Sequence, residues 1–130
     1  MALSGKQYAD AAVGVIPFVL EHIEALKTKR NLELQKISDL KQRKTQRYEA
    51  VVSIDQTAEE HGGTSANDDF KIYMHNNSMA TYDCEIQARM RMVKVLDTAL
   101  KDQTIYLDHL KCITGWNDAA DIEKELLDSL

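Results

Sequence analysis

Glu60-His61-Gly62-Gly63-Thr64-Ser65-Ala66-Asn67 joins two long stretches, residues 18–60 and 68–114, that contain neither glycine nor proline. The glycine pair favours the end of one helix, and Ser65 or Asn67 can cap the start of the next. At 1.5 Å per residue, each stretch would extend over more than roughly 50 Å as a helix. We therefore predict an all-α fold in a single domain, residues 1–130, in which the two long helices form an antiparallel hairpin or bundle.

Shorter helices are predicted at both ends of this pair. Ser4 can cap a short helix over 5–15, and Pro17 either begins the long helix 18–60 or kinks a continuous one. After a loop at 61–67, the second long helix covers 68–114. A break at 75–78 is left open, because His75-Asn76-Asn77-Ser78 has poor helix propensity. Gly115 predicts the end of that helix, and Asn117 can cap a final short helix over 118–129.

The composition supports helices and gives no sign of a membrane span. One proline and five glycines leave few turn sites for a many-stranded sheet, and 6% aromatic residues imply an aliphatic core. The apolar run at 11–20 is too short to cross a bilayer, and no cleavage site follows it. We expect it to pack at the end of the bundle or to insert into a groove of a partner. Insertion into a membrane surface is a weaker hypothesis. We expect a location in the cytoplasm, or in a particle assembled inside a cell.

Both long stretches repeat apolar residues at helical spacings, but with different periods. In the first, Val15, Leu26, Ile37 and Tyr48 recur every eleven residues. In the second, two rows follow sevens, with Arg89 and Gln103 as their polar members: Met79, Ile86, Val93, Leu100 and Leu107, and Tyr82, Arg89, Leu96, Gln103 and Leu110. Because the periods differ, we expect local packing beside a region that diverges or takes a partner.

Charge is distributed unevenly along the chain. Residues 27–47 hold eight basic residues against two acidic ones, whereas residues from 55 onward hold fifteen acids against seven bases. The segment 41–47 has no apolar side chain, so it must be solvated, paired with acids or bound from outside. An anionic partner such as a nucleic acid is possible but not favoured, since the chain has a net charge of −5. Its contact residues would be Lys36, Lys41, Arg43, Lys44 and Arg47.

No arrangement of residues indicates catalysis, a metal or a cofactor. The four histidines do not stand at metal-ligand spacings from one another, and no Cys-x-x-Cys, nucleophile elbow or phosphate loop is present. Cys84 and Cys112 would lie too far apart on one helix to form a disulfide, so we expect reduced thiols. We therefore expect a protein that is not an enzyme.

The pattern indicates a structural or assembly protein that self-associates or packs against partner helices. The apolar seams of two long helices exceed what one hairpin can enclose, which favours an oligomer or a helical protein partner. A chaperone for export or assembly, holding a partner segment near residues 13–20 or the final helix, is the main alternative, and nucleic-acid binding through 27–47 is another. The predicted interface residues are Leu34, Ile37, Ile86, Val93, Leu96, Leu100, Leu107, Leu110 and Trp116.

Overall fold

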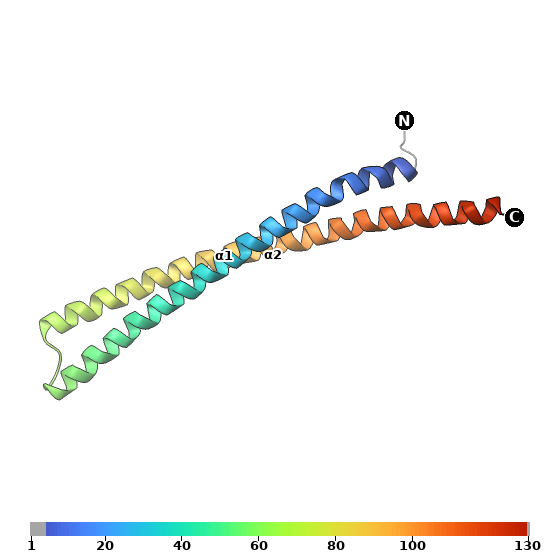
Figure 1. Ribbon diagram of the computed structural model, residues 1–130. Helices are drawn as coiled ribbons and strands as arrows, with labels where there is room; N and C mark the ends of the chain where they lie inside the picture. Colours follow the sequence, from blue (N-terminus) through green and yellow to red (C-terminus); the bar gives the residue numbers. More distant parts are fainter. Residues whose placement is uncertain (1–4, 130) are drawn as a thin grey trace. The chain divides into compact units, whose positions relative to one another are not determined.

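Two long α-helices make up the fold. The computed structural model describes the backbone of residues 5–129, and the side chains of residues 5–115 and 126–129. Helix α1 covers Gly5–Glu60 and helix α2 covers Ala66–Asp128, and the described residues contain no strand. A short loop at Gly62 and Gly63 joins them (Figure 1). Residue numbers rise along one helix as they fall along the other, since Glu33 contacts Arg89 and Arg47 contacts His75. The predicted all-α, antiparallel pair of long helices is confirmed.

Helix α1 is continuous where the sequence predicts two helices, 5–15 and 18–60. Gly14 and Pro17 both lie within it, and the predicted cap Ser4 falls outside the described residues. Proline removes the N–H that would bond the carbonyl four residues earlier, here that of Val13. Both Pro17 and Val13 are exposed. Water can therefore hydrate the orphaned carbonyl, and the helix tolerates the proline.

Helix α2 is also continuous, from Ala66 to Asp128, where the sequence leaves open a break at 75–78 and predicts an end at Gly115. Low helix propensity amounts to less than about 1 kcal/mol per residue, which packing easily exceeds. His75 and Ser78 are half-buried within the helix pair. The segment predicted as a separate helix over 118–129 is helical through Asp128, but it continues α2 without a turn.

The connection between the helices is built from two standard caps. Gly62 and Gly63 have positive φ angles of 86° and 135°, and their amides donate to the carbonyls of Glu59 and Ala58 at 3.3 and 2.8 Å. This pair of bonds is a Schellman motif, which satisfies the last carbonyls of α1. At the start of α2, the Ser65 hydroxyl accepts a bond from the Asp68 amide, and Asp68 accepts one from the Ser65 amide, both at 3.1 Å. Ser65 is thus the cap, one of the two predicted.

The chain divides into two units, each a pair of antiparallel helix segments. Unit 1 comprises residues 5–29 of α1 and residues 96–128 of α2. Its core is the buried set Ala12, Val19, Ile23, Leu107 and Leu110, flanked by Ile16, Leu100 and Ile113. Unit 2 comprises residues 30–95 and contains the loop. Its core is Ile37, Leu40 and Ile86, flanked by Tyr82 and Val93.

The seven-residue pattern of α2 predicts its inward-facing side correctly. All ten positions of the two predicted rows are buried or half-buried, including the polar members Arg89 and Gln103. The eleven-residue row of α1 is less accurate, because Leu26 and Ile37 are buried while Val15 and Tyr48 are exposed. On α1 the inward positions follow alternating steps of four and three residues instead, as in Ala12, the half-buried Ile16, Val19, Ile23 and Leu26.

Candidate interaction surfaces

Most of the predicted interface residues contact the other helix of the same chain. Ile37, Ile86, Leu96, Leu107 and Leu110 are buried, and Val93 and Leu100 are half-buried against the two cores. Leu34 is 39% exposed, and the side chain of Trp116 lies outside the described residues. The structure therefore brings seven of the nine into the hairpin interior. A second molecule that binds the folded hairpin would therefore contact side chains other than these seven.

A polar layer separates apolar contacts within unit 2. Arg89 Nη1 donates a 2.9 Å hydrogen bond to Glu33 Oε2 on α1, and Arg89 Nη2 donates a 3.3 Å bond to Glu85 Oε1. The Glu33 bond is the main cause that raises the pKa of Arg89 above its ordinary value, against the opposing effect of partial burial. The Arg89 Nε atom is buried without a hydrogen-bond partner in the structure. Losing Glu33 would therefore leave this guanidinium poorly satisfied.

The basic stretch of α1 is partly neutralised by its own chain. Lys44 Nζ lies 2.8 Å from Asp83 Oδ1, and Lys36 Nζ lies 3.7 Å from Glu33 Oε1. Arg47 Nη1 donates a 3.2 Å hydrogen bond to His75 Nδ1. In the described part of the chain, Lys41 and Arg43 form no ion pair. The cationic surface that an anionic partner could use is consequently smaller than the sequence alone suggests.

A second apolar stripe runs along α1 in unit 1, beside the buried one. Tyr8, Ala11, Val15 and Phe18 follow steps of three and four residues, which places them on one side of the helix. All four are exposed; Tyr8 is 51% and Phe18 72% exposed. Sequence reasoning missed this stripe because it assigned Val15 to the core row. The three-and-four spacing was the available signal.

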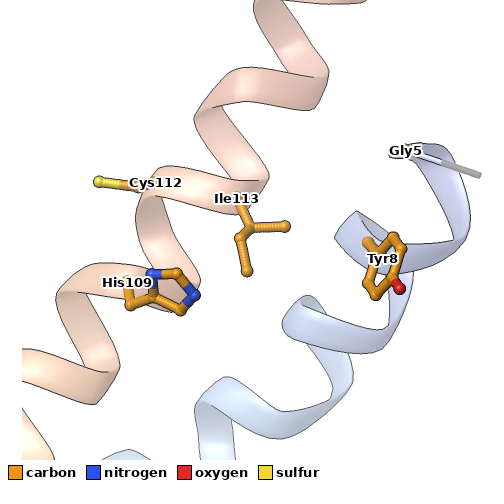
Figure 2. A pocket seen from close by; sticks show the side chains of 5 residues that line it. All are labelled: Gly5, Tyr8, His109, Cys112 and Ile113. Carbon is orange, nitrogen blue, oxygen red and sulfur yellow. The ribbon is translucent and has the colours of Figure 1, made fainter.

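Helix α2 contributes to the same side of unit 1. Tyr8 lines an open pocket of about 430 Å³ with Gly5, His109, Cys112 and Ile113. Figure 2 shows His109 and Ile113 pointing from α2 toward α1, whereas the Cys112 thiol points away. Both cysteines, Cys84 and Cys112, are exposed free thiols. The pocket therefore shows which side of α2 lies beside the exposed stripe of α1 that begins at Tyr8.

Antiparallel geometry extends this shared side over two further turns. Val15 lies seven residues after Tyr8, and Tyr106 lies seven residues before Ile113, so Val15 and Tyr106 come to the same level. Tyr106 is 43% exposed. We name this surface the Phe18 face and define it by Tyr8, Ala11, Val15 and Phe18 of α1, with Tyr106, His109 and Ile113 of α2.

The described residues contain neither a metal-binding cluster nor a membrane-spanning window. Among the residues that the structure describes, no group of three or more His, Cys, Asp or Glu side chains is placed to hold a metal ion. Within the same residues, neither helix contains a window apolar enough to cross a membrane. No protein-family model, no curated protein and no solved structure matches the chain.

Proposed function

We propose that this chain is a non-enzymatic helical assembly protein that self-associates through the Phe18 face, in the cytoplasm or in a particle assembled inside a cell. The observation that carries the proposal is the exposure of Tyr8, Val15 and Phe18 at helical spacing beside Tyr106. Scattered exposed apolar residues are ordinary, but a contiguous apolar face is typical of an interaction site.

A second layer of helices would bury apolar side chains that are exposed in the single chain. Fully burying one large apolar side chain contributes about 1.5–3 kcal/mol, and Phe18 is 72% exposed. The core of unit 1 uses one stripe of each helix, so the stripe that contains Phe18 has no partner among the described residues. Three-and-four spacing is the pattern by which helices interlock side chains in bundles. A further pair of helices would complete a four-helix bundle.

A second copy of the chain is the occupant that we propose for this face. The face contains no Asp, Glu, Lys or Arg, so it offers no charge that would select a differently charged partner. A two-fold contact would place the face of one copy on the same face of another, which is the commonest arrangement of soluble oligomers. The buried predicted residues, such as Leu107 and Leu110, would then support the interface from within each copy.

A chaperone that holds a partner segment is the second candidate. The exposure of Val13, Phe18 and Leu20 favours it, because the apolar run at 11–20 is where the sequence leads us to expect such a groove. The two functions differ in the state of the purified chain. Self-association predicts an oligomer of the chain alone, whereas a chaperone would leave the face open until a client segment is supplied.

Substitution of Phe18 tests the proposal. Phe18→Glu replaces an apolar side chain of the face that is 72% exposed with a charge, and it should raise the dissociation constant of self-association at least about tenfold. Leu32→Glu is the matched control, because Leu32 is also an exposed apolar residue of α1, 53% exposed, but lies in unit 2. Concentration-dependent size-exclusion chromatography gives the readout, with circular dichroism to verify helix content. Equal elution of wild type and Phe18→Glu at every concentration would refute the Phe18 face.

A further inference from the structure

A row of exposed residues runs along α2 in unit 2, on the side opposite the unit 2 core. Cys84 is exposed, whereas Ile86, two residues further along and about 200° around the helix, is buried. From Cys84 the row continues in both directions by steps of four, three and four residues, which keeps its members within about 40° of Cys84 around the helix. We name this surface the Cys84 row and define it by seven exposed residues: Tyr73, Asn77, Ala80, Cys84, Ala88, Arg91 and Val95.

The spacing of the Cys84 row is the same in both directions from its central residue. Ala80 and Ala88 lie four residues from Cys84, Asn77 and Arg91 lie seven, and Tyr73 and Val95 lie eleven. If two such helices pack antiparallel with Cys84 opposite Cys84, every member of one row faces the member at equal distance in the other. A two-fold axis at Cys84 produces this arrangement. The row is therefore complementary in spacing to a second copy of itself.

Large apolar side chains lie at both ends of the row. Tyr73 and Val95 are 64% and 63% exposed, so pairing them across two copies would bury apolar surface at each end. Met74 and Met92, which are 45% and 49% exposed, lie ten residues before and eight residues after Cys84. At helical spacing both are on the same side of the row, and antiparallel packing brings Met74 of one copy close to the level of Met92 of the other.

The middle of the row suits close contact between two helices. The side chains of Ala80, Cys84 and Ala88 are small, and the distance between packed helices depends on the size of the side chains at the contact. Asn77 would face Arg91 of the other copy. The Asn77 amide oxygen accepts hydrogen bonds and the Arg91 guanidinium donates them, so this polar pair is complementary as well.

The acidic residues beside the centre of the row are neutralised within the chain. Asp83 and Glu85 flank Cys84 in the sequence. Asp83 Oδ1 lies 2.8 Å from Lys44 Nζ, and Glu85 Oε1 accepts a 3.3 Å hydrogen bond from Arg89 Nη2. A second copy that approaches the row would therefore meet carboxylates whose charge is already compensated, which reduces the repulsion between like charges.

We propose that two copies of this chain pack antiparallel through the Cys84 row, with a two-fold axis at Cys84. The symmetric spacing and the complementary pair of Asn77 and Arg91 carry the choice of a second copy as the occupant, because they match the row to itself. This contact does not depend on the Phe18 face, which lies in unit 1 and uses other residues. It goes beyond the proposed function, because a chain with two different two-fold contacts can join successive copies into an assembly larger than a dimer.

Disulfide cross-linking in the full chain tests the register of this contact. Every protein carries Phe18→Glu, so that the Phe18 face does not contribute, and Cys112→Ser, so that Cys84 is the remaining thiol. Diamide, an azo oxidant, accepts the two protons and two electrons that two Cys84 thiols lose as the S–S bond forms. Two further proteins carry Cys84→Ser with either Ala80→Cys or Ala88→Cys. Gel electrophoresis without reductant measures the covalent dimer, and circular dichroism verifies helix content.

The expected result is cross-linking that depends on position. The Cys84 protein should form covalent dimer at least about tenfold faster than the Ala80→Cys or the Ala88→Cys protein alone, because contact raises the effective thiol concentration. In the antiparallel register, position 80 of one copy lies roughly 12 Å along the helix axis from position 80 of the other, which is too far for a disulfide. An equimolar mixture of the Ala80→Cys and Ala88→Cys proteins should cross-link readily, since the two thiols then face each other.

Ala88→Glu tests the same contact without a thiol. In the Phe18→Glu background it places a charge in the row and should raise the dissociation constant of self-association at least about tenfold, as measured by sedimentation velocity. Gln42→Glu is the matched control, because it adds the same charge at an exposed residue of α1 in unit 2.

Three results would overturn the contact through the Cys84 row. They are equal cross-linking rates for the three single-cysteine proteins, no cross-linking when the Ala80→Cys and Ala88→Cys proteins are mixed, and equal association of the Ala88→Glu and Gln42→Glu proteins with helix content intact. None of them bears on the Phe18 face, because every protein compared here carries Phe18→Glu. The test of that face compares wild type with Phe18→Glu.

Discussion

Glu33 and Arg89 lie 56 residues apart in the sequence and are joined by a 2.9 Å hydrogen bond between α1 and α2. Arg89 occupies a position in the seam where the seven-residue pattern of α2 would otherwise place an apolar side chain. A shift of one helix along the other would separate the two charges and leave each, partly buried, with only its partner on the same helix, Glu85 for Arg89 and Lys36 for Glu33. The pair therefore selects one register of the hairpin in unit 2.

Exchanging these charges should show that they set the register. Glu33→Gln weakens the bond, and Glu33→Arg, which places two guanidinium groups together, should lower stability further. The double variant Glu33→Arg with Arg89→Glu should recover part of the loss, because opposite charges face each other again. Urea unfolding, monitored by circular dichroism, measures the free energy of unfolding of each variant and so their order of stability. Glu24→Gln is the control, since the Glu24 pair with Lys27 is exposed and within one helix. A double variant no more stable than Glu33→Arg would contradict the account.

Truncating a core residue of unit 1 should destabilise the chain by about 2–3 kcal/mol. Leu107→Ala removes a side chain that is 7% exposed and packs in the unit 1 core, leaving a cavity or a partial collapse. Ile105→Ala serves as the comparison, because Ile105 is two residues away on the same helix and is 57% exposed. Its effect should stay within about 0.5 kcal/mol in the same urea titration. Equal losses for both would mean that the core is wrongly assigned.

Gly62 should tolerate alanine poorly. Its φ of 86° lies in the left-handed region, where a Cβ costs roughly 1–2 kcal/mol. Gly62→Ala should therefore destabilise the hairpin by about that amount, and Gly62→Asn by less, because asparagine accepts this conformation more readily. Gly14→Ala should act in the opposite direction, since Gly14 is exposed inside α1 and alanine there reduces the entropy lost on folding. Thermal unfolding should therefore show a lower melting temperature than wild type for the two Gly62 variants and a higher one for Gly14→Ala.

The cap of α2 makes stability depend on pH. The hydrogen bond from the Ser65 amide to Asp68 is the main cause that lowers the pKa of Asp68 below its ordinary value of 3.8. Ionised Asp68 therefore stabilises the folded state above the unfolded pKa, and this contribution disappears as the pH falls through the lowered value. Asp68→Asn should thus lose less stability than wild type between about pH 5 and pH 2.

Substituting Ser65 separates the two halves of this cap. Ser65→Ala removes the hydroxyl acceptor of the Asp68 amide, but it keeps the backbone donor to the carboxylate. It should cost about 1 kcal/mol at neutral and acid pH alike. Urea titrations of Asp68→Asn, Ser65→Ala and wild type at both pH values measure this difference. An Asp68→Asn protein with the same acid loss as wild type would show that the carboxylate does not stabilise the cap.

The sequence predicted the long helices because their signals are local. The glycine pair and Ser65 mark the two helix ends by backbone geometry and capping, which depend on few residues. At Pro17 and at 75–78, where the sequence leaves an interruption open, the structure has continuous helix, and α2 also continues past Gly115, where the sequence predicts its end. Weak propensities yield to packing and to the continuity of a formed helix. His75 illustrates this, since its contact with Arg47 comes from 28 residues away.

The candidate surfaces were harder to predict than the helices. The seven-residue rows identify apolar residues such as Ile86 and Leu107, but a row alone does not say whether its partner is the same chain or another. The structure shows them packed within the hairpin. Only then can Phe18 be recognised as exposed, because its neighbours Val19 and Ile23 already occupy the inward side of α1.

Sedimentation equilibrium of the wild-type chain at micromolar concentrations tests self-association most directly. The account predicts a mass of at least twice the chain mass of 14.7 kDa, decreasing toward that value on dilution. A mass of 14.7 kDa at every concentration up to the solubility limit would contradict it.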